Sequence, residues 1–161
     1  MKKTIVIAFL SATLFSCTTT NEKPATAETA TVKSSCVREG AEIDLMKKVI
    51  TAYSNGDWAT FASYFSDTAK SYYNADTVAS TMADRIANFK KQRETLDGNI
   101  DSGEPNLEVV TLENGKTKWG HAWITFKSKS KAGVAKRTLT FVSFGIRDGK
   151  ILMEHVIYDT K

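Results

Sequence analysis

The feature that most restricts how this 161-residue chain can fold is a predicted hairpin near its end, which is apolar on both faces. Residues 134–147 and 150–158 read as two strands joined by the turn dipeptide Asp148-Gly149. With a two-residue turn, one face carries Val142, Phe144, Ile146, Ile151, Met153 and His155, and the other carries Leu139, Phe141, Ser143, Glu154, Val156 and Tyr158. Because an apolar sheet face needs a cover, we expect helices on one side and a ligand cavity, a partner subunit or both on the other.

The segment from residue 41 to residue 65 predicts two helices. Apolar residues recur at intervals of three and four over 41–55 and again over 58–65. Gly56 is placed to end the first helix, because glycine takes the left-handed conformation without a Cβ clash. Asp57 can cap the second helix by accepting hydrogen bonds from its first backbone N–H groups. These features predict a helix–turn–helix unit with its apolar stripes directed at a core.

A short strand and a third helix are predicted next. Residues 69–73 read as the strand, and Asn74 or Asp76 can cap a helix that runs to about Leu96. Its apolar stripe consists of Val78, Met82, Ile86 and Phe89.

Beyond residue 105 the hydrophobic period becomes two, which is typical of strands. Residues 106–113 and 117–127 read as two strands joined by Asn114-Gly115, a strong signal for a type I′ hairpin turn. A longer turn around 129–133 leads into the C-terminal hairpin. Helices followed by a run of antiparallel strands predict an α+β fold.

The charge of the chain gives no indication of a nucleic-acid partner. The formal charge is +4, and removal of Lys2 and Lys3 with a leader that has no acidic residue lowers it to +2. The two basic runs, residues 90–93 and 127–131, are interpreted as a solvated helix end and a hairpin tip.

Residues 1–16 are interpreted as a signal peptide. Two lysines precede an apolar run that is too short to span a bilayer. The run ends in Leu14-Phe15-Ser16-Cys17, which resembles the lipobox of bacterial lipoproteins. The resemblance implies lipidation of Cys17 and a location in a bacterial cell envelope, in the outer membrane or on the periplasmic face. Cleavage by an ordinary signal peptidase is the alternative interpretation.

Residues 17–40 are interpreted as a lipidated cysteine and a flexible tether. The segment is rich in Thr, Ala, Glu, Lys and Ser and has almost nothing to bury. If Cys17 carries lipid, the other cysteine of the chain, Cys36, has no intramolecular partner. We interpret Cys36 as an incidental thiol.

The order of these segments resembles the nuclear transport factor 2-like superfamily, and especially its SnoaL-like bacterial members. The resemblance covers residues 41–161 and rests on the 55–58 turn, the aromatic residues in 61–65, and the stretches 147–151 and 158–159. It implies an α+β fold in which a cone-shaped, curved antiparallel sheet wraps around three N-terminal helices. It also implies an apolar cavity at the open end and a homodimer formed through the sheet.

The superfamily includes ketosteroid isomerases, dehydratases and cyclases, so the residues needed for isomerase chemistry can be checked. That chemistry uses a carboxylate base, a tyrosine and a protonated aspartate. Alignment on the Gly56-Asp57 turn puts Tyr73 at the base position, Val49 at the tyrosine position and Val142 near the aspartate position. The sequence therefore gives no support to that mechanism.

Other catalytic and metal motifs are also missing from the sequence. The two histidines, His121 and His155, come without an HExxH motif or cysteine pairs, and we expect neither a metal nor a cofactor. Ser143 does not lie in a nucleophile elbow. An enzyme of the isomerase, dehydratase or cyclase type would have to pair His121 or His155 with Glu108 or Glu154 as acid and base.

Aromatic and polar residues on the predicted strands and third helix are the candidates for a cavity wall. These candidates are Tyr73, Met82, His121, Trp123, Phe141, His155 and Tyr158. Alternation along the last strand directs either His155 or Tyr158 inward, and the resemblance favours Tyr158.

Our leading interpretation is a lipid-anchored envelope protein whose SnoaL-like domain binds a small apolar or amphipathic molecule. The alternatives are the histidine-based enzyme and a dimeric protein-interaction module. A cavity holding a histidine next to a carboxylate would favour the enzyme, and a filled core with an apolar outer sheet face would favour the module.

Overall fold

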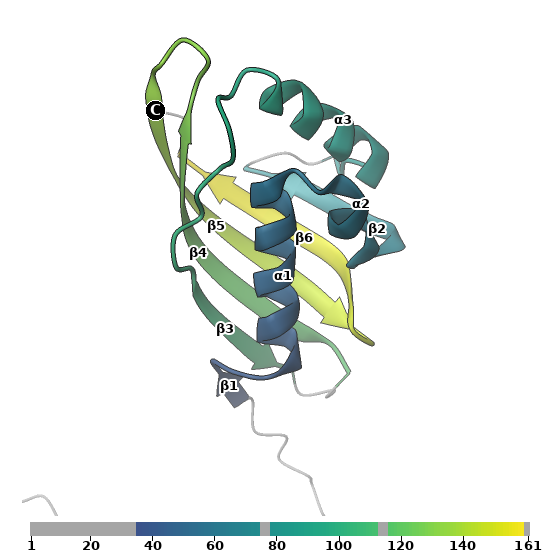
Figure 1. The fold of residues 1–161 in the computed structure, drawn as a ribbon. Coiled ribbons are helices and arrows are strands. Elements are labelled where there is room, and N and C mark those ends of the chain that lie inside the picture. The colour runs from purple at the N-terminus through teal and green to yellow at the C-terminus, as the bar shows by residue number, and fades with distance from the viewer. Residues whose placement is uncertain (1–34, 75–77, 113–115, 160–161) are drawn as a thin grey trace, which may run out of the picture. The chain divides into compact units, whose positions relative to one another are not determined.

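A computed structural model describes residues 35–74, 78–112 and 116–159, which form six strands and three helices (Figure 1). The signal segment, Cys17, most of the tether and the Asn114-Gly115 turn lie outside the described residues. The described residues fall within one compact unit, Thr31–Lys161.

The first two helices follow the sequence prediction closely at the turn between them. Helix α1 spans Ala41–Asn55 and α2 spans Trp58–Ser63. Gly56 ends α1 in the left-handed conformation, with a φ of 72°. The Asp57 carboxylate accepts a hydrogen bond of 3.1 Å from the backbone N–H of Thr60. This N-cap satisfies one of the backbone donors that every helix leaves unpaired at its start.

Helix α3 begins later than the sequence predicts. It spans Met82–Arg93, and Thr81 rather than Asn74 is its N-cap, accepting a hydrogen bond from the backbone N–H of Asp84. Asn74 takes a positive φ of 48°, and its side chain accepts from the backbone N–H of Tyr158. The asparagine therefore ties two strands together, while Asp76, the other predicted cap, lies outside the described residues.

The six strands form one sheet with the order β1-β3-β4-β5-β6-β2. The strands are β1 Ser35–Val37, β2 Phe65–Tyr73, β3 Asn106–Thr111, β4 Lys118–Lys129, β5 Ala135–Arg147 and β6 Lys150–Tyr158. Strand β2 begins at Phe65, which was predicted to lie in the second helix, and β1 comes from the predicted tether. Neighbouring described strands are antiparallel except β2 and β6, which pair in parallel.

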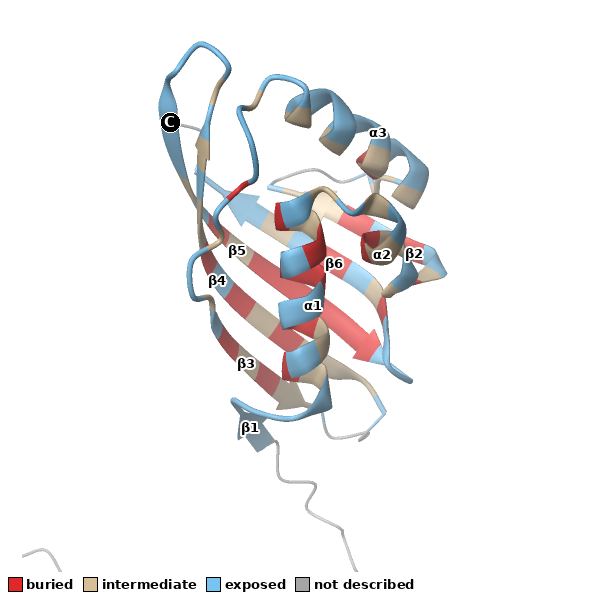
Figure 2. Cartoon of the chain, viewed as in Figure 1, coloured by how far each residue is buried: buried red, intermediate tan, exposed pale blue. Residues whose placement is uncertain are grey.

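The three helices lie on one face of the curved sheet, the inner face (Figure 1). Buried positions lie on the side of α1 that faces the sheet and on the strands beneath it (Figure 2). The core includes Met46 and Val49 from α1, Phe61 from α2 and alternate residues of the strands. The predicted α+β architecture, a curved sheet around three helices, is confirmed.

The register of the C-terminal hairpin differs from the predicted one because of a β-bulge. Ile146 pairs with Ile151 as expected, but Gly145 then pairs with Met153 and Phe144 with Glu154, so Leu152 is the extra residue. A bulge sets two residues against one and reverses which side chains beyond it face the core. As a result, Glu154 is buried on the inner face with 2% exposure.

Candidate functional site

A cavity of about 750 Å³ lies between the inner face of the sheet and the helices. Its body is apolar, with walls that include Val49, Ile50, Ile124, Phe126, Val142, Phe144 and Val156. Pockets that bury a small organic molecule have volumes of about 300–1,000 Å³ and walls of this kind. The cavity is therefore the right size for such a ligand.

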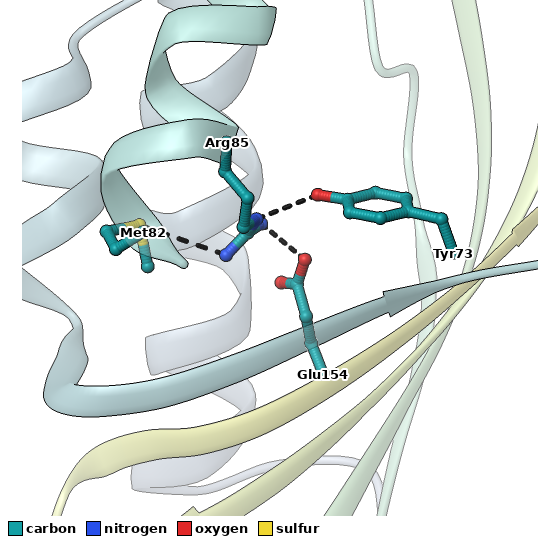
Figure 3. A network of polar contacts seen from close by, with 4 residues as sticks. All are labelled: Tyr73, Met82, Arg85 and Glu154. Carbon is teal, nitrogen blue, oxygen red and sulfur yellow. Dashed lines mark hydrogen bonds and ion pairs between the residues drawn. The ribbon is translucent and has the colours of Figure 1, made fainter. Parts of the chain in front are cut away.

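One end of the cavity holds a buried polar network of Tyr73, Arg85 and Glu154. Figure 3 shows Arg85 reaching from α3 toward the sheet, with the other two side chains directed at its guanidinium. The Arg85 Nε donates a hydrogen bond of 2.7 Å to the Tyr73 hydroxyl, and Nη2 forms an ion pair with Glu154 Oε1. The side chains of Arg85 and Glu154 are each only 3% exposed.

Aromatic rings surround the guanidinium of Arg85 on its other sides. Its Cζ lies 5.1 Å from the ring centroid of Phe61, 4.9 Å from that of Phe65 and 5.4 Å from that of Phe89. A cation over the negative face of a ring gains electrostatic stabilisation, and more so away from water. The rings and Glu154 together explain how a charged arginine is held in the interior.

Burial controls the ionisation of the acidic members of the network. It raises the pKa of Glu154, and the Arg85 guanidinium acts in the opposite direction. Burial also raises the pKa of the Tyr73 phenol. Since an unperturbed phenol already has a pKa of about 10, Tyr73 stays protonated at neutral pH.

The geometry makes Tyr73 a hydrogen-bond donor. Its oxygen accepts from Arg85, so the single phenol proton can go either to Glu154 or to an oxygen of a bound molecule. A protonated phenol of this kind binds a carbonyl or hydroxyl group well and is a poor base.

The residues predicted to line the cavity divide between the two faces of the sheet. Tyr73 and Tyr158 line the cavity. Met82 lies beside the network, with its Sδ 3.9 Å from Arg85 Nη1.

The other four candidates, His121, Trp123, Phe141 and His155, lie on the outer face. They alternate with the inward residues Ala122, Ile124, Val142 and Glu154 along the same strands. His121 and Trp123 pack against the Phe141 ring, at centroid distances of 5.7 and 5.2 Å. The His155 ring lies 5.5 Å from Tyr72. The cavity wall therefore contains Glu154 without a histidine partner from this set.

Arg85 is the site residue that the sequence reasoning missed. The third helix was interpreted through its apolar stripe alone, and no role was assigned to Arg85. Arg85 follows Met82 by three positions and precedes Phe89 by four, which puts all three on one helix face. A charged residue at such a position is the signal that could have identified a buried ion pair.

The structure provides two further observations on site chemistry and membrane contact. Among residues 35–74, 78–112 and 116–159, no group of three or more His, Cys, Asp or Glu side chains is arranged to hold a metal ion. Within the same residues, no helix is long and apolar enough to cross a membrane.

Comparison with known proteins identifies the fold. No family model and no curated protein matches the sequence. A putative polyketide cyclase from Xanthomonas campestris pv. campestris has a similar structure, with a TM-score of 0.58 and 12% identity over 74% of this chain and 90% of that one. A nuclear transport factor 2-like protein from Anabaena variabilis ATCC 29413 is also similar, with a TM-score of 0.58 and 13% identity over 75% of this chain and 88% of that one.

A third similar structure is a ketosteroid isomerase-like protein from Erwinia carotovora atroseptica SCRI1043. It gives a TM-score of 0.57 and 11% identity over 74% of this chain and 94% of that one. The domain therefore has the nuclear transport factor 2-like fold, which confirms the predicted fold class. Identities this low establish the fold alone.

Proposed function

We propose that this domain binds a small molecule that has an apolar body and a hydroxyl or carbonyl group. The observation that supports the proposal best is the apolar cavity of about 750 Å³ with Tyr73, Arg85 and Glu154 at one end. The apolar walls would cover the body of the ligand, and the phenol proton of Tyr73 would reach its oxygen. Structural neighbours described as a putative polyketide cyclase and a putative isomerase accord with a small-molecule cavity.

Binding accounts for the site better than histidine-based catalysis does. His121 and His155 both lie on the outer face, whereas Glu154 faces the cavity and is paired with Arg85. A histidine acting with Glu154 as acid and base would need both groups within reach of one bound molecule. We therefore favour binding over this enzyme alternative.

Replacing Tyr73 with phenylalanine should weaken the binding of a ketone probe such as 2-decanone. The loss of one ordinary hydrogen bond, about 0.5–1.5 kcal/mol, corresponds to a dissociation constant about two- to tenfold higher. Isothermal titration calorimetry measures the change directly. The Tyr72→Phe variant is the matched control, because it removes the same hydroxyl from the next residue, whose ring packs against His155 on the outer face.

The Tyr73→Phe substitution also leaves Arg85 Nε without its acceptor, so unfolding in urea should be recorded for both variants. Equal affinity of the wild type, Tyr73→Phe and Tyr72→Phe proteins for the ketone would refute the assigned role of Tyr73. The proposed function would be refuted if the wild-type protein bound neither 2-decanone nor any molecule that co-purifies with the protein.

We also propose that the domain is anchored in a bacterial cell envelope through lipid on Cys17. The basis is the Leu14-Phe15-Ser16-Cys17 sequence after a short apolar run. A lipidated N-terminal cysteine of this kind carries more than one acyl chain, which is what stable attachment to a bilayer requires.

The Cys17→Ser variant should lose the lipid and either move to a soluble envelope fraction or accumulate as uncleaved precursor. Phase partitioning in a cloud-point detergent distinguishes the lipidated protein from the variant. The control is Cys36→Ser, which should stay in the detergent phase. A Cys17→Ser protein that partitions into detergent as the wild type does would show that Cys17 is not the anchor.

A second copy of the chain is proposed to cover the outer face of the sheet. Trp123, Phe141 and Ile157 are register partners across β4, β5 and β6 and form a continuous apolar row. Two large side chains of this row remain well exposed, Trp123 at 44% and Ile157 at 51%. Exposed apolar patches of connected residues are typical of interaction sites, and a two-fold homodimer would bring two such patches together.

A further inference from the structure

The cavity wall changes polarity along strand β5. The inward residues of this strand, in order from the Glu154 end, are Phe144, Val142, Thr140, Thr138 and Lys136, and all of them line the cavity. Strand β4 follows the same order, since Phe126 pairs with Thr138 and Ser128 with Lys136. The wall therefore runs from apolar side chains through hydroxyl groups to an ammonium group.

The two polar ends of the cavity are well separated. Phe144 on β5 is the register partner of Glu154, and Lys136 lies eight residues before Phe144 on β5. At about 3.3 Å per residue, the strand covers roughly 26 Å between these two positions. A ligand that contacts both ends must be elongated, with a polar group at each end of an apolar body.

The two ends of the cavity also differ in net charge; the end with Tyr73 is called the inner end and the end with Lys136 the outer end. Arg85 and Glu154 neutralise each other at the inner end. At the outer end, Lys127 and Lys129 form ion pairs with Asp101 and Asp97, at 3.5 and 3.9 Å. Within the described part of the chain, Lys136 has no carboxylate partner, so it contributes an uncompensated positive charge to the cavity wall.

We propose that the ligand is an amphipathic acid, with its anionic group at Lys136 and its apolar body directed toward Tyr73. This proposal rests on the function proposed above and specifies the class of ligand. The opposite orientation is unfavourable, because an acid group at Arg85 would add a second negative charge to a buried pair that is already neutral. At Lys136 the same acid group meets an unpaired cation and stays near water.

Three probes with the same sixteen-carbon body test the charge at the outer end. The acid is 16-hydroxyhexadecanoate, the neutral probe is 1,16-hexadecanediol and the cation is 16-aminohexadecan-1-ol, so that each carries a hydroxyl group for Tyr73. The wild-type protein should bind the acid about two- to fivefold more tightly than the diol, the effect of one partly exposed ion pair. Added salt should reduce the difference, because it screens exposed charges.

Two variants assign this preference to a residue. Lys136→Gln should bind the acid and the diol equally. Arg137→Gln is the matched control, since Arg137 is the next residue on the strand and is not among the cavity residues. This control should keep the full preference for the acid.

The possible results separate this inference from the proposed function. Equal binding of the acid and the diol by the wild type overturns the inference and leaves small-molecule binding in place. A preference for the acid that persists in Lys136→Gln also overturns it. Failure of all three probes to bind the wild type overturns the inference and counts against the proposed function, which 2-decanone and co-purifying molecules test separately.

Discussion

Replacing Arg85 with methionine should destabilise the domain by about 3–5 kcal/mol, because it leaves a buried carboxylate without its counter-charge. Arg85 and Glu154 are each 3% exposed, so the carboxylate that remains is largely removed from water. Urea denaturation followed by circular dichroism measures the change in the free energy of unfolding. The matched control is Lys118→Met, which removes the lysine of the Glu42–Lys118 ion pair. In that pair the Lys118 side chain is 35% exposed and the Glu42 side chain 24%, so the pair should contribute about 0–1 kcal/mol.

The double variant Arg85→Met/Glu154→Leu should recover most of the stability that the single variant loses. Replacing a buried ion pair with apolar side chains of similar size is often neutral or stabilising, in contrast to the removal of one partner. The single and double variants together therefore measure the cost of the unpaired carboxylate. A double variant as unstable as Arg85→Met would show that the loss comes from packing around the arginine instead.

The stability deficit of the single variant should depend on pH. Burial already raises the pKa of Glu154, and removing Arg85 takes away the nearby charge that lowers it. A carboxyl group whose pKa is higher in the folded protein than in the unfolded chain makes the fold more stable at low pH than at high pH. This stabilisation is complete at pH values below the unfolded pKa, which is about 4.3 for glutamate. That stabilisation is lost as the pH rises through the folded pKa. The deficit of Arg85→Met relative to the wild type should therefore be smaller at pH 4.5 than at pH 7.

Local sequence signals were sufficient to predict most of the fold. Gly56 and Asp57 mark the end of one helix and the start of the next, because each residue has a conformational or capping property that the turn requires. The period of two and the turn dipeptides located strands β3 to β6 within a few residues. The start of helix α3 was predicted less well, because several polar residues near it can act as N-caps and tertiary contacts select among them.

The sequence was less informative about which side chains face the cavity. Alternation along a strand gives the two sets of residues and leaves open which set faces the helices. Tyr73 and Tyr158 could be placed through the resemblance to a known fold, whereas Trp123 and His121 were assigned to the cavity from their residue types alone. The bulge at Leu152 reversed the alternation along β6, and a bulge of this kind has no residue signature in the sequence here. The inward position of Glu154 and its pairing with Arg85 could therefore be seen only in three dimensions.

Replacing Trp123 with aspartate should convert a dimeric protein into a monomer. Trp123 lies at the β4 end of the apolar row on the outer face, next to its register partner Phe141, and is 44% exposed. Removal of a tryptophan that acts as an interface hot spot costs about 2 kcal/mol or more, which weakens association by roughly thirtyfold or more. Burying the introduced carboxylate in the interface without a partner would add a further cost. Sedimentation velocity at micromolar concentrations should show a dimer for the wild type and a monomer for the variant.

The design of this experiment must separate an interface effect from other causes. The chain from Thr18 onward with Cys36→Ser removes the lipid and any intermolecular disulfide through the exposed thiol of Cys36. Val78→Asp is the matched control, because Val78 is 79% exposed and lies outside strands β3 to β6. This control should remain dimeric. A wild-type domain that stays monomeric throughout the micromolar range would exclude a second copy as the cover and leave the Trp123–Phe141–Ile157 row available to a different protein partner.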